Sequence, residues 1–349
     1  MCPKQPETSV SVEGDPGAPE GGGPLERVLA FSAVPADHPL RKTVVAFKFG
    51  GSSLLGAERM LHSAGLVREA ALRSRVCVVV SAMKGVTDRL LRIAELLAKN
   101  ETPKARRQAE DIAAVHLETL EDLKLAEGKR ERVEQELKLL SRDLLHETPA
   151  EGRVPVNDAL RDRLASFGER YAARLFAAAL GRLGVPAVPV ASSDFVLTCE
   201  TFRDAKPRLE HTERHGREIL GPLLETGIVP VVTGFIGATE DGRITTLGRN
   251  SSDFSGALVA QVVDAEELVI WTDVDGIYTV NPHDSEEAKL FDELSYDEAH
   301  ALAASGAKVL HPNVLPLAAQ TEMTVWVRNT FKPETRGTRI GAQQNGGVA

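Results

Sequence analysis

The stretch Thr43-Val-Val-Ala-Phe-Lys-Phe-Gly-Gly-Ser-Ser53 joins an apolar, β-branched and aromatic run to two glycines. Such a run is typical of a strand in a parallel sheet, where both faces of the strand are covered. Lys48 lies at the end of the predicted strand, and Gly50 and Gly51 allow a tight turn that leaves backbone N–H groups accessible. The two serines favour the start of a helix. These are the parts of a phosphate-binding site, although an ordinary strand-to-helix turn has the same pattern.

The amino-acid composition limits which classes of protein and partner are possible. The chain has 349 residues, 42% hydrophobic and 26% charged, a balance typical of a globular protein with a sizeable core. The net charge is -9 and no basic stripe is interleaved with aromatic residues, so we expect no nucleic-acid partner. Cys2, Cys77 and Cys199 are far apart, which argues against a zinc site or a disulfide framework. Without a membrane-spanning run or a signal peptide, the sequence predicts a cytoplasmic protein with no membrane contact.

The first half of the chain predicts alternating strands and helices. Residues 1–42 are rich in Pro, Gly and Glu, so we expect a disordered N-terminal extension. The sequence then predicts a helix over 57–73, a strand over 76–81 and a helix over 89–97. This order indicates a parallel sheet, in which ligands bind at the carboxyl ends of the strands. Residues 104–145 are charged and helix-periodic, and Gly128 predicts the break of a helical hairpin with a solvated face.

The second half continues this alternation. Gly168 lies inside a predicted helix over 157–183, where glycine is costly, so we expect another element to approach closely there. The sequence also predicts strands over 187–191, 228–236, 268–272 and 325–328, a hairpin at 237–242, and helices over 252–263 and 296–304. Residues 341–349 form a short tail.

Several polar residues have two interpretations from the sequence alone. Glu169 is either a solvent-facing helix residue or a ligand for a cation or an amine. Arg249 precedes a predicted helix N-terminus at Ser252, an arrangement typical of an anion site. Asp253 is either a capping carboxylate or a site residue, because Asp is common in the first turn of a helix. The loop that contains Asp275 either borders a nucleotide or is a plain turn.

Six motifs occur in an order that resembles the aspartokinases, which belong to the amino-acid kinase family. The resemblance covers roughly residues 43–340, and six motifs in one order are more specific than any one of them. They are Lys48-Phe-Gly-Gly-Ser-Ser, Ser81-Ala-Met-Lys-Gly-Val-Thr-Asp, Ser166-Phe-Gly-Glu-Arg, Thr245-Thr-Leu-Gly-Arg, Thr272-Asp-Val-Asp-Gly-Ile-Tyr and Gly306-Ala-Lys-Val-Leu-His-Pro.

The resemblance implies an α/β protein, a three-layer α/β/α sandwich with a central, mostly parallel sheet. It implies a catalytic domain over 43–340, in which the part over about 43–225 binds aspartate and the part over about 226–340 binds the nucleotide. The implied reaction is ATP-dependent phosphorylation of the β-carboxylate of L-aspartate to 4-phospho-L-aspartate. This is the first step toward lysine, threonine, methionine or a derived metabolite. Mg²⁺ is implied as a bridge between phosphates, without a set of protein ligands.

The matching motifs also imply roles for individual residues. Lys48 would face the transferring phosphoryl group, Glu169 would bind the substrate ammonium, and Arg249 would bind its α-carboxylate. The implied catalytic residues are Lys48, Asp253 and Lys308, and the implied substrate-binding residues are Thr87, Glu169, Arg249 and Ser252. The implied nucleotide-binding residues are Gly50, Gly51, Ser52, Thr272, Asp273, Tyr278, His283 and Lys308.

The implied reaction explains these residue types. A carboxylate nucleophile is already ionised at neutral pH, because its reference pKa is about 4, so no general base is required. Two anions must approach each other, and positively charged groups therefore stabilise the transition state.

The sequence departs from the family pattern at three places. Asn250 and Ser251 stand where many members have two glycines, and Asn281-Pro-His283 stands where Asp-Pro-Arg is usual. Most aspartokinases continue into regulatory ACT domains, whereas this sequence ends at Ala349. We therefore expect a rate that lysine, threonine and methionine do not change.

Other functions and partners stay open at this stage. We expect a homo-oligomer, with a separate regulatory or pathway subunit as an alternative. A kinase of the same fold could act on a different acid, and a degenerate subunit could serve as a scaffold. The pair Glu169 and Arg249 favours an amino-acid substrate, because an ammonium and a carboxylate complement these two charges.

Overall fold

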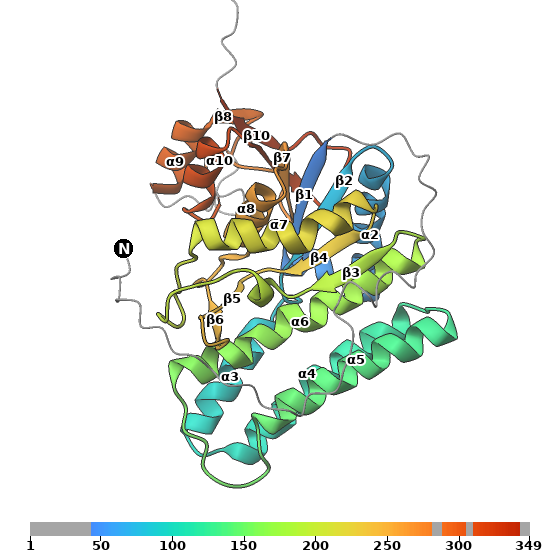
Figure 1. Cartoon of the computed structure of the whole chain (residues 1–349), viewed down its shortest axis with the longest axis vertical. Coiled ribbons are helices and arrows are strands. Elements are labelled where there is room, and N and C mark those ends of the chain that lie inside the picture. The colour runs from blue at the N-terminus through green and yellow to red at the C-terminus, as the bar shows by residue number, and fades with distance from the viewer. Residues whose placement is uncertain (1–42, 281–287, 305–309, 343–349) are drawn as a thin grey trace, which may run out of the picture. The chain divides into compact units, whose positions relative to one another are not determined.

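The computed structural model describes residues 43–280, 288–304 and 310–342. Within these residues, strands and helices follow one another along the chain, with four successive helices, α3 to α6, between β2 and β3 (Figure 1). The strands are β1 (Val44–Phe49), β2 (Arg75–Val80), β3 (Ala187–Val190), β4 (Val229–Thr233), β5 (Ile236–Ala238), β6 (Ile244–Thr246), β7 (Glu267–Thr272), β8 (Glu293–Ser295), β9 (Thr324–Asn329) and β10 (Thr338–Gly341). The helices are α2 (Gly56–Ala71), α3 (Val86–Ala98), α4 (Thr102–Asp122), α5 (Glu127–His146), α6 (Asp158–Arg182), α7 (Leu209–Glu225), α8 (Ser252–Val262), α9 (Tyr296–Ala304) and α10 (Val314–Gln320).

The central sheet has the strand order β3-β4-β2-β1-β7-β9-β10-β8. Neighbouring strands are parallel except for β9 and β10, which are antiparallel. The last four residues of β1 are buried, as expected for an apolar strand with neighbours on both edges and helices on both faces. β5 and β6 form a separate antiparallel pair.

Helices cover both faces of this sheet. On one face, α2 and α6 contact β2, α6 also contacts β3 and β4, and α3 packs on α6. The α4–α5 hairpin packs outside them, against α3 and α6 (Figure 1). On the other face, α7 and α8 pack on each other, with α8 on β1, β2 and β7, and α10 contacts α8. The predicted α/β/α sandwich with a mostly parallel sheet is therefore confirmed.

An aromatic cluster fixes β1 between its neighbours. The Phe49 ring stacks on Trp271 of β7, with 6.2 Å between centroids, and lies 5.2 Å from the Phe176 ring of α6. All three side chains are buried. Buried aromatic pairs of this kind add to the hydrophobic contribution of their area, so the first strand, β7 and α6 are held as one unit.

The start of α2 differs from the prediction. Ser52 and Ser53 were expected to begin the helix, but Gly51–Leu54 forms a 3-10 turn and α2 begins at Gly56. The Oγ atom of Ser53 lies 2.7 Å from Thr330 Oγ1, so this serine joins two distant segments instead of capping a helix.

Two further helix boundaries differ. α3 begins at Val86, three residues before the predicted start, because Gly85 adopts a φ of 82° and serves as its N-cap. The break of the α4–α5 hairpin lies before Gly128, where Lys124 has a φ of 50°, and Gly128 itself is inside α5.

The second half of the chain contains more elements than the sequence predicted. The strand expected over 228–236 is divided into β4 and β5, because Phe235 has a φ of 68° and changes the chain direction. The strand over 325–328 is not the last one, since β10 pairs with it. α7 was not predicted; a Cβ on its Gly216 would lie 2.6 Å from Val262 Cγ1 of α8. β8 and α10 were also not predicted, whereas the predicted hairpin at 237–242 is formed by β5 and β6.

Several predictions lie outside the described residues. They concern the extension over 1–42, the site residues His283 and Lys308, and residues 343–349 of the tail. None of the helices in the described part of the chain is long and apolar enough to cross a bilayer.

Gly168 of α6 packs directly against the segment that follows β2, as the sequence analysis anticipated. A Cβ at Gly168 would lie 2.6 Å from the Cβ of Ala82 and 3.4 Å from Val86 Cγ1. Gly181, near the end of the same helix, has no such neighbour. Only the first glycine is therefore required for packing.

We predict that Gly168→Ala lowers the free energy of unfolding by about 1–3 kcal/mol, because overpacking forces the backbone to shift. The matched variant Gly181→Ala should raise it by about 0.5–1 kcal/mol, because alanine favours the helix. Denaturant unfolding measures both, and a gain in stability for Gly168→Ala would contradict the close packing.

His116 of α4 is buried against the α6 side chain Tyr171, with the two rings stacked at 4.3 Å. Its Nδ1 lies 2.6 Å from the Ile112 carbonyl, and its Nε2 has no hydrogen-bond partner among the described residues. Burial lowers the pKa of His116 to about 4, and the nearby charge of Arg89 acts in the same direction. The folded protein therefore holds this imidazole neutral.

We predict that stability falls as the solution is acidified from pH 7 to pH 5. An unfolded histidine has a pKa of about 6.5, so the unfolded chain binds the extra proton in this range and the folded chain does not. The contribution of His116 is a loss of about 2 kcal/mol in the free energy of unfolding. Denaturant unfolding should show this loss in the wild type and in the exposed-site control His300→Gln, but not in His116→Phe. An equal loss in all three proteins would contradict the assignment.

Candidate active site

The carboxyl ends of β1, β2 and β7 lie at one edge of the sheet because the three strands are parallel neighbours. Backbone hydrogen bonds continue past the strand ends: Gly50 N–H donates to the Trp271 carbonyl at 3.1 Å, and Ser81 N–H donates to the Phe49 carbonyl at 3.1 Å. The loops that begin here are therefore fixed relative to one another. Open α/β sheets bind their ligands at this edge.

Lys48 and Asp253 form an ion pair at this edge. Lys48 Nζ lies 2.7 Å from Asp253 Oδ1, and only 7% of the lysine residue is exposed. The α8 residue Gly256 allows the lysine stem to pass, because a Cβ there would lie 3.1 Å from Lys48 Cβ. A buried ammonium requires such a partner, and the pair holds the lysine at the strand end. Asp253 therefore contacts Lys48, which helix capping alone would not require.

Glu169 lies on α6 and points into the same region. Its Oε1 accepts a hydrogen bond of 3.0 Å from Ala82 N–H, while Oε2 is buried without a hydrogen-bond partner among the described residues. Burial raises the pKa of Glu169 to about 8, and the Ala82 N–H and the positive charge of Lys48 oppose that rise. The solvent-facing interpretation of Glu169 is therefore wrong. An unpaired carboxyl oxygen in a buried position is suited to accept a donor from a ligand.

The glycine turn after β1 packs against the loop after β2. Lys84 N–H donates to the Gly51 carbonyl at 3.0 Å, and a Cβ on Gly51 would lie 2.6 Å from the Ala82 carbonyl oxygen. Ser81 Oγ donates to Ser252 Oγ at 2.9 Å, which joins this loop to the N-terminus of α8. The loop thus contacts both the glycine turn and α8.

Other predicted residues surround this centre. Thr87 is half-buried in the first turn of α3, and Ser52 is half-buried in the 3-10 turn. Arg249 is exposed, between Gly248 and Asn250, which have φ values of 96° and 60°. Arg249 therefore lies in a loop of left-handed residues and forms no ion pair with the described residues.

The predicted nucleotide residues follow β7. Asp273 Oδ2 lies 4.0 Å from Lys84 Nζ, so the β7 loop approaches the loop after β2. Thr272 is half-buried at the strand end, and Tyr278 is half-buried farther along the loop. The structure thus places Thr272 and Asp273 beside the glycine turn.

Asp275 holds the β7 loop to the end of β9. Its Oδ1 accepts from Asn329 Nδ2 at 2.5 Å, and its Oδ2 pairs with Lys332 Nζ at 2.9 Å. These two hydrogen bonds lower the pKa of Asp275, so the carboxylate stays ionised. The plain-turn interpretation missed this role, because Asn329 and Lys332 carry no sequence signal that links them to Asp275.

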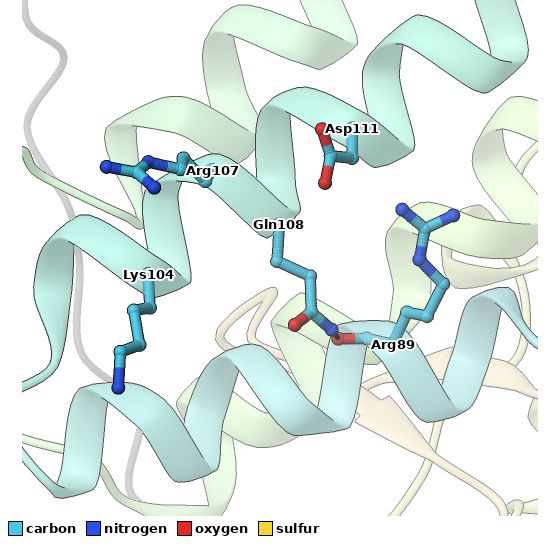
Figure 2. A pocket seen from close by; sticks show the side chains of 5 residues that line it. All are labelled: Arg89, Lys104, Arg107, Gln108 and Asp111. Carbon is cyan, nitrogen blue, oxygen red and sulfur yellow. Dashed lines mark hydrogen bonds between the residues drawn. The ribbon is translucent and has the colours of Figure 1, made fainter.

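Among the described residues, no metal site accompanies the candidate active site, and the groove between α3 and α4 is separate from it. Among residues 43–280, 288–304 and 310–342, no group of three or more His, Cys, Asp or Glu side chains is arranged to hold a metal ion. Figure 2 shows an open groove of about 320 Å³ between α3 and α4 that contains none of the predicted site residues. It is lined by Arg89, Lys104, Arg107, Gln108 and Asp111.

Comparisons with known proteins agree with the fold and the motifs. Lysine-sensitive aspartokinase 3 of Escherichia coli (strain K12) is 35% identical over 298 residues, which are 85% of this chain and 64% of that protein. Aspartokinase 1, chloroplastic, of Arabidopsis thaliana is 32% identical over 84% of this chain and 51% of that protein. This chain therefore spans less than two thirds of the length of these two relatives.

A solved structure of E. coli aspartokinase III in complex with aspartate and ADP is also similar. It has a TM-score of 0.76 and 32% identity, covering 87% of this chain and 65% of that chain. Residues 43–329 match the amino acid kinase family over most of the chain. The chain belongs to the amino acid kinase family.

Proposed function

We propose that the chain is an aspartate kinase, which transfers the γ-phosphoryl group of ATP to the β-carboxylate of L-aspartate. The observation that supports this most directly is the buried Glu169 Oε2, which has no hydrogen-bond partner in the described part of the chain and lies close enough to Lys48 for the carboxyl group to be affected by its charge. The carboxyl group of Glu169 is suited to bind an ammonium, and the ammonium of Lys48 is suited to stabilise a developing negative charge. The similarity to aspartokinases supports aspartate as the substrate.

In the proposed reaction, a β-carboxylate oxygen forms a bond to the γ-phosphorus while the bond from that phosphorus to the bridging oxygen of ADP breaks. The products are 4-phospho-L-aspartate and ADP. No proton has to leave the nucleophile, since the carboxylate is ionised at neutral pH. Lys48, held by Asp253 at 2.7 Å, stabilises the charge on the transferring group.

The substrate side is proposed to contain four residues. Glu169 accepts the ammonium and Arg249 binds the α-carboxylate, while Thr87 and Ser252 donate hydroxyl groups. Arg249 and Ser252 belong to the part of the chain over 226–340, so the proposed division into an aspartate part and a nucleotide part is not strict. The substrate would contact both parts.

The nucleotide side is proposed to lie along the glycine turn and the β7 loop. Gly50, Gly51 and Ser52 hold phosphates, and Thr272, Asp273 and Tyr278 line the nucleotide. His283 and Lys308, outside the described residues, are proposed for the same role. Nucleotide-bound Mg²⁺ usually keeps several waters and is bound through substrate phosphates rather than by a cage of protein ligands, so this proposal requires no cluster of acidic side chains. When bound, Mg²⁺ neutralises phosphate charge.

The wider role of the product is also a proposal. We infer that 4-phospho-L-aspartate enters the pathway to lysine, threonine, methionine or a derived metabolite, in the cytoplasm, and that the enzyme is a homo-oligomer. The E. coli relative named lysine-sensitive has a solved structure with lysine and aspartate. We also propose that lysine, threonine and methionine do not change the rate of this 349-residue chain.

The test of the proposed function is ADP release by the 349-residue chain with ATP, Mg²⁺ and L-aspartate. L-Glutamate and D-aspartate serve as comparisons, and hydroxylamine traps the acyl phosphate as a hydroxamate. We expect turnover that requires L-aspartate. Hydroxamate formation with another acid and not with aspartate would show a different substrate.

Lys48→Met should lower the turnover number by about 10²–10³, because one preorganised positive contact to the transition state is lost. Methionine keeps the apolar stem that packs on Gly256, and Asp253, whose side chain is 21% exposed, can be solvated in the variant. Folding should therefore be retained, and circular dichroism should match the wild type. Turnover close to that of the wild type would contradict the proposed role of Lys48.

Glu169→Gln should raise KM for aspartate by about 10–100-fold, the usual range for a lost charge-assisted hydrogen bond, with little change in KM for ATP. In the wild type, KM for aspartate should fall as pH rises from 6.5 to 8.5. The pKa of Glu169 is about 8 in the empty site, and an ammonium binds the charged carboxylate. Glu169→Gln should remove this pH dependence, and a parallel profile in both proteins would contradict the assignment.

Arg249→Ala should also raise KM for aspartate, while the exposed arginine of the same segment, Arg243, provides the control. Arg243 pairs with Glu200 and Asp241 at the surface, so Arg243→Ala should leave both Michaelis constants unchanged.

A further inference from the structure

Asp162 is a buried carboxylate of α6 for which the proposed reaction has no role. Only 2% of the residue is exposed. Its Oδ2 accepts hydrogen bonds of 2.8 Å from the backbone N–H groups of Arg203 and Thr246, and its Oδ1 accepts one of 2.9 Å from Thr246 Oγ1. All three donors come from outside α6. The carboxylate therefore joins this helix to the loop that contains Arg203 and to the last residue of β6.

The two segments joined by Asp162 also contact each other. Ala205 N–H donates to the Thr246 carbonyl at 2.9 Å, and a Cβ on Gly248 would lie 2.9 Å from Asp204 Oδ1. Arg203 has a φ of 71°, a conformation that non-glycine residues rarely adopt without support. The hydrogen bond from Arg203 N–H to Asp162 provides that support.

Asp162 and Glu169 lie seven residues apart on α6. Two turns of an α-helix separate them, so they occupy the same face. Glu169 holds the loop after β2 through Ala82 N–H, and Asp162 holds Thr246, which is three residues before Arg249. One rigid helix thus sets the positions of both the proposed ammonium site and the segment that carries Arg249. α6 lies against β6 in the structure (Figure 1).

We propose that Asp162 is a positioning residue for the amino-acid substrate: it holds the loop over 201–207 and the end of β6 against α6, so that Arg249, in the loop after β6, stays at a fixed place relative to Glu169. The inference rests on the proposed function, because it assigns Arg249 to the substrate carboxylate. A small displacement of a binding group is enough to weaken substrate binding strongly.

The first test compares two variants of Asp162. Asp162→Ala leaves two backbone N–H groups and one hydroxyl without their acceptor, and we expect KM for aspartate to rise about tenfold or more. Asp162→Asn can keep its oxygen at the two N–H groups and donate its amide to Thr246 Oγ1, so KM for aspartate should stay within about threefold of the wild type. KM for ATP should change by less than about twofold in both variants. Equal increases in both Michaelis constants would overturn the proposal.

A second pair of variants carries the test if Asp162→Ala does not fold. Thr246→Val removes only the hydroxyl bond to Asp162, and we expect KM for aspartate to rise about threefold to tenfold. The control is Thr245→Val in the same strand, whose hydroxyl instead pairs with Thr198 Oγ1 at 2.7 Å. It loses a comparable buried contact without releasing α6, so KM should not change. The same increase in both variants would overturn the positioning role.

Hydrogen exchange tests, without an activity assay, whether Asp162 holds these two segments against α6. In Asp162→Ala, the amides of Arg203 and Thr246 should exchange at least about tenfold faster, while amides of β1 and β7 keep their protection. Unchanged exchange would overturn the proposal. If the wild-type chain showed no aspartate-dependent turnover, the proposed function and the assignment of Arg249 would be overturned. Hydrogen exchange would still decide whether Asp162 holds the two segments.

Discussion

The arrangement of the site depends on a positive charge that is buried at the end of β1. Lys48 lies on a strand with neighbours on both edges, and only 7% of the residue is exposed. An unpaired buried charge would be strongly destabilising, and Asp253 prevents this at 2.7 Å. This requirement fixes the position of α8 relative to β1. The carboxylate of Asp253 lies in the first turn of α8, and the lysine stem packs against Gly256, where a side chain would crowd it.

The helix α6 provides the second fixed element. Gly168 lets the helix approach Ala82 so closely that a methyl group would clash, and the adjacent Glu169 therefore reaches the backbone of the same loop. The close approach has a second effect, because it removes water from Glu169 and raises the pKa of its carboxyl group. Packing and electrostatics at this point have the same cause. The close approach allowed at Gly168 thus contributes to the burial that raises the pKa of Glu169.

Much of the fold could be predicted because the signals are local. The apolar run before Gly50 gave β1, and alternation of strands and helices gave the parallel sheet. Errors occurred where tertiary contacts override local preference. Serine is a common helix-capping residue, but Ser53 instead forms a hydrogen bond with Thr330. Phe235 has a positive φ and divides a continuous apolar run into two strands. α7 was not predicted, and its Gly216 is required by a contact with α8 that lies far away in the sequence.

The site could be predicted only where a residue type carries its own signal. Lys48 and Glu169 belong to motifs, although burial of Glu169 could not be read from helix statistics. Asp162 and Asp275 have partners 84 and 54 residues away, and two of the donors to Asp162 are backbone N–H groups, which nearly every residue has. Such contacts leave no pattern in one sequence. They matter most for Arg249, since an exposed arginine in a loop gains affinity for a carboxylate only to the extent that its backbone is already held in place.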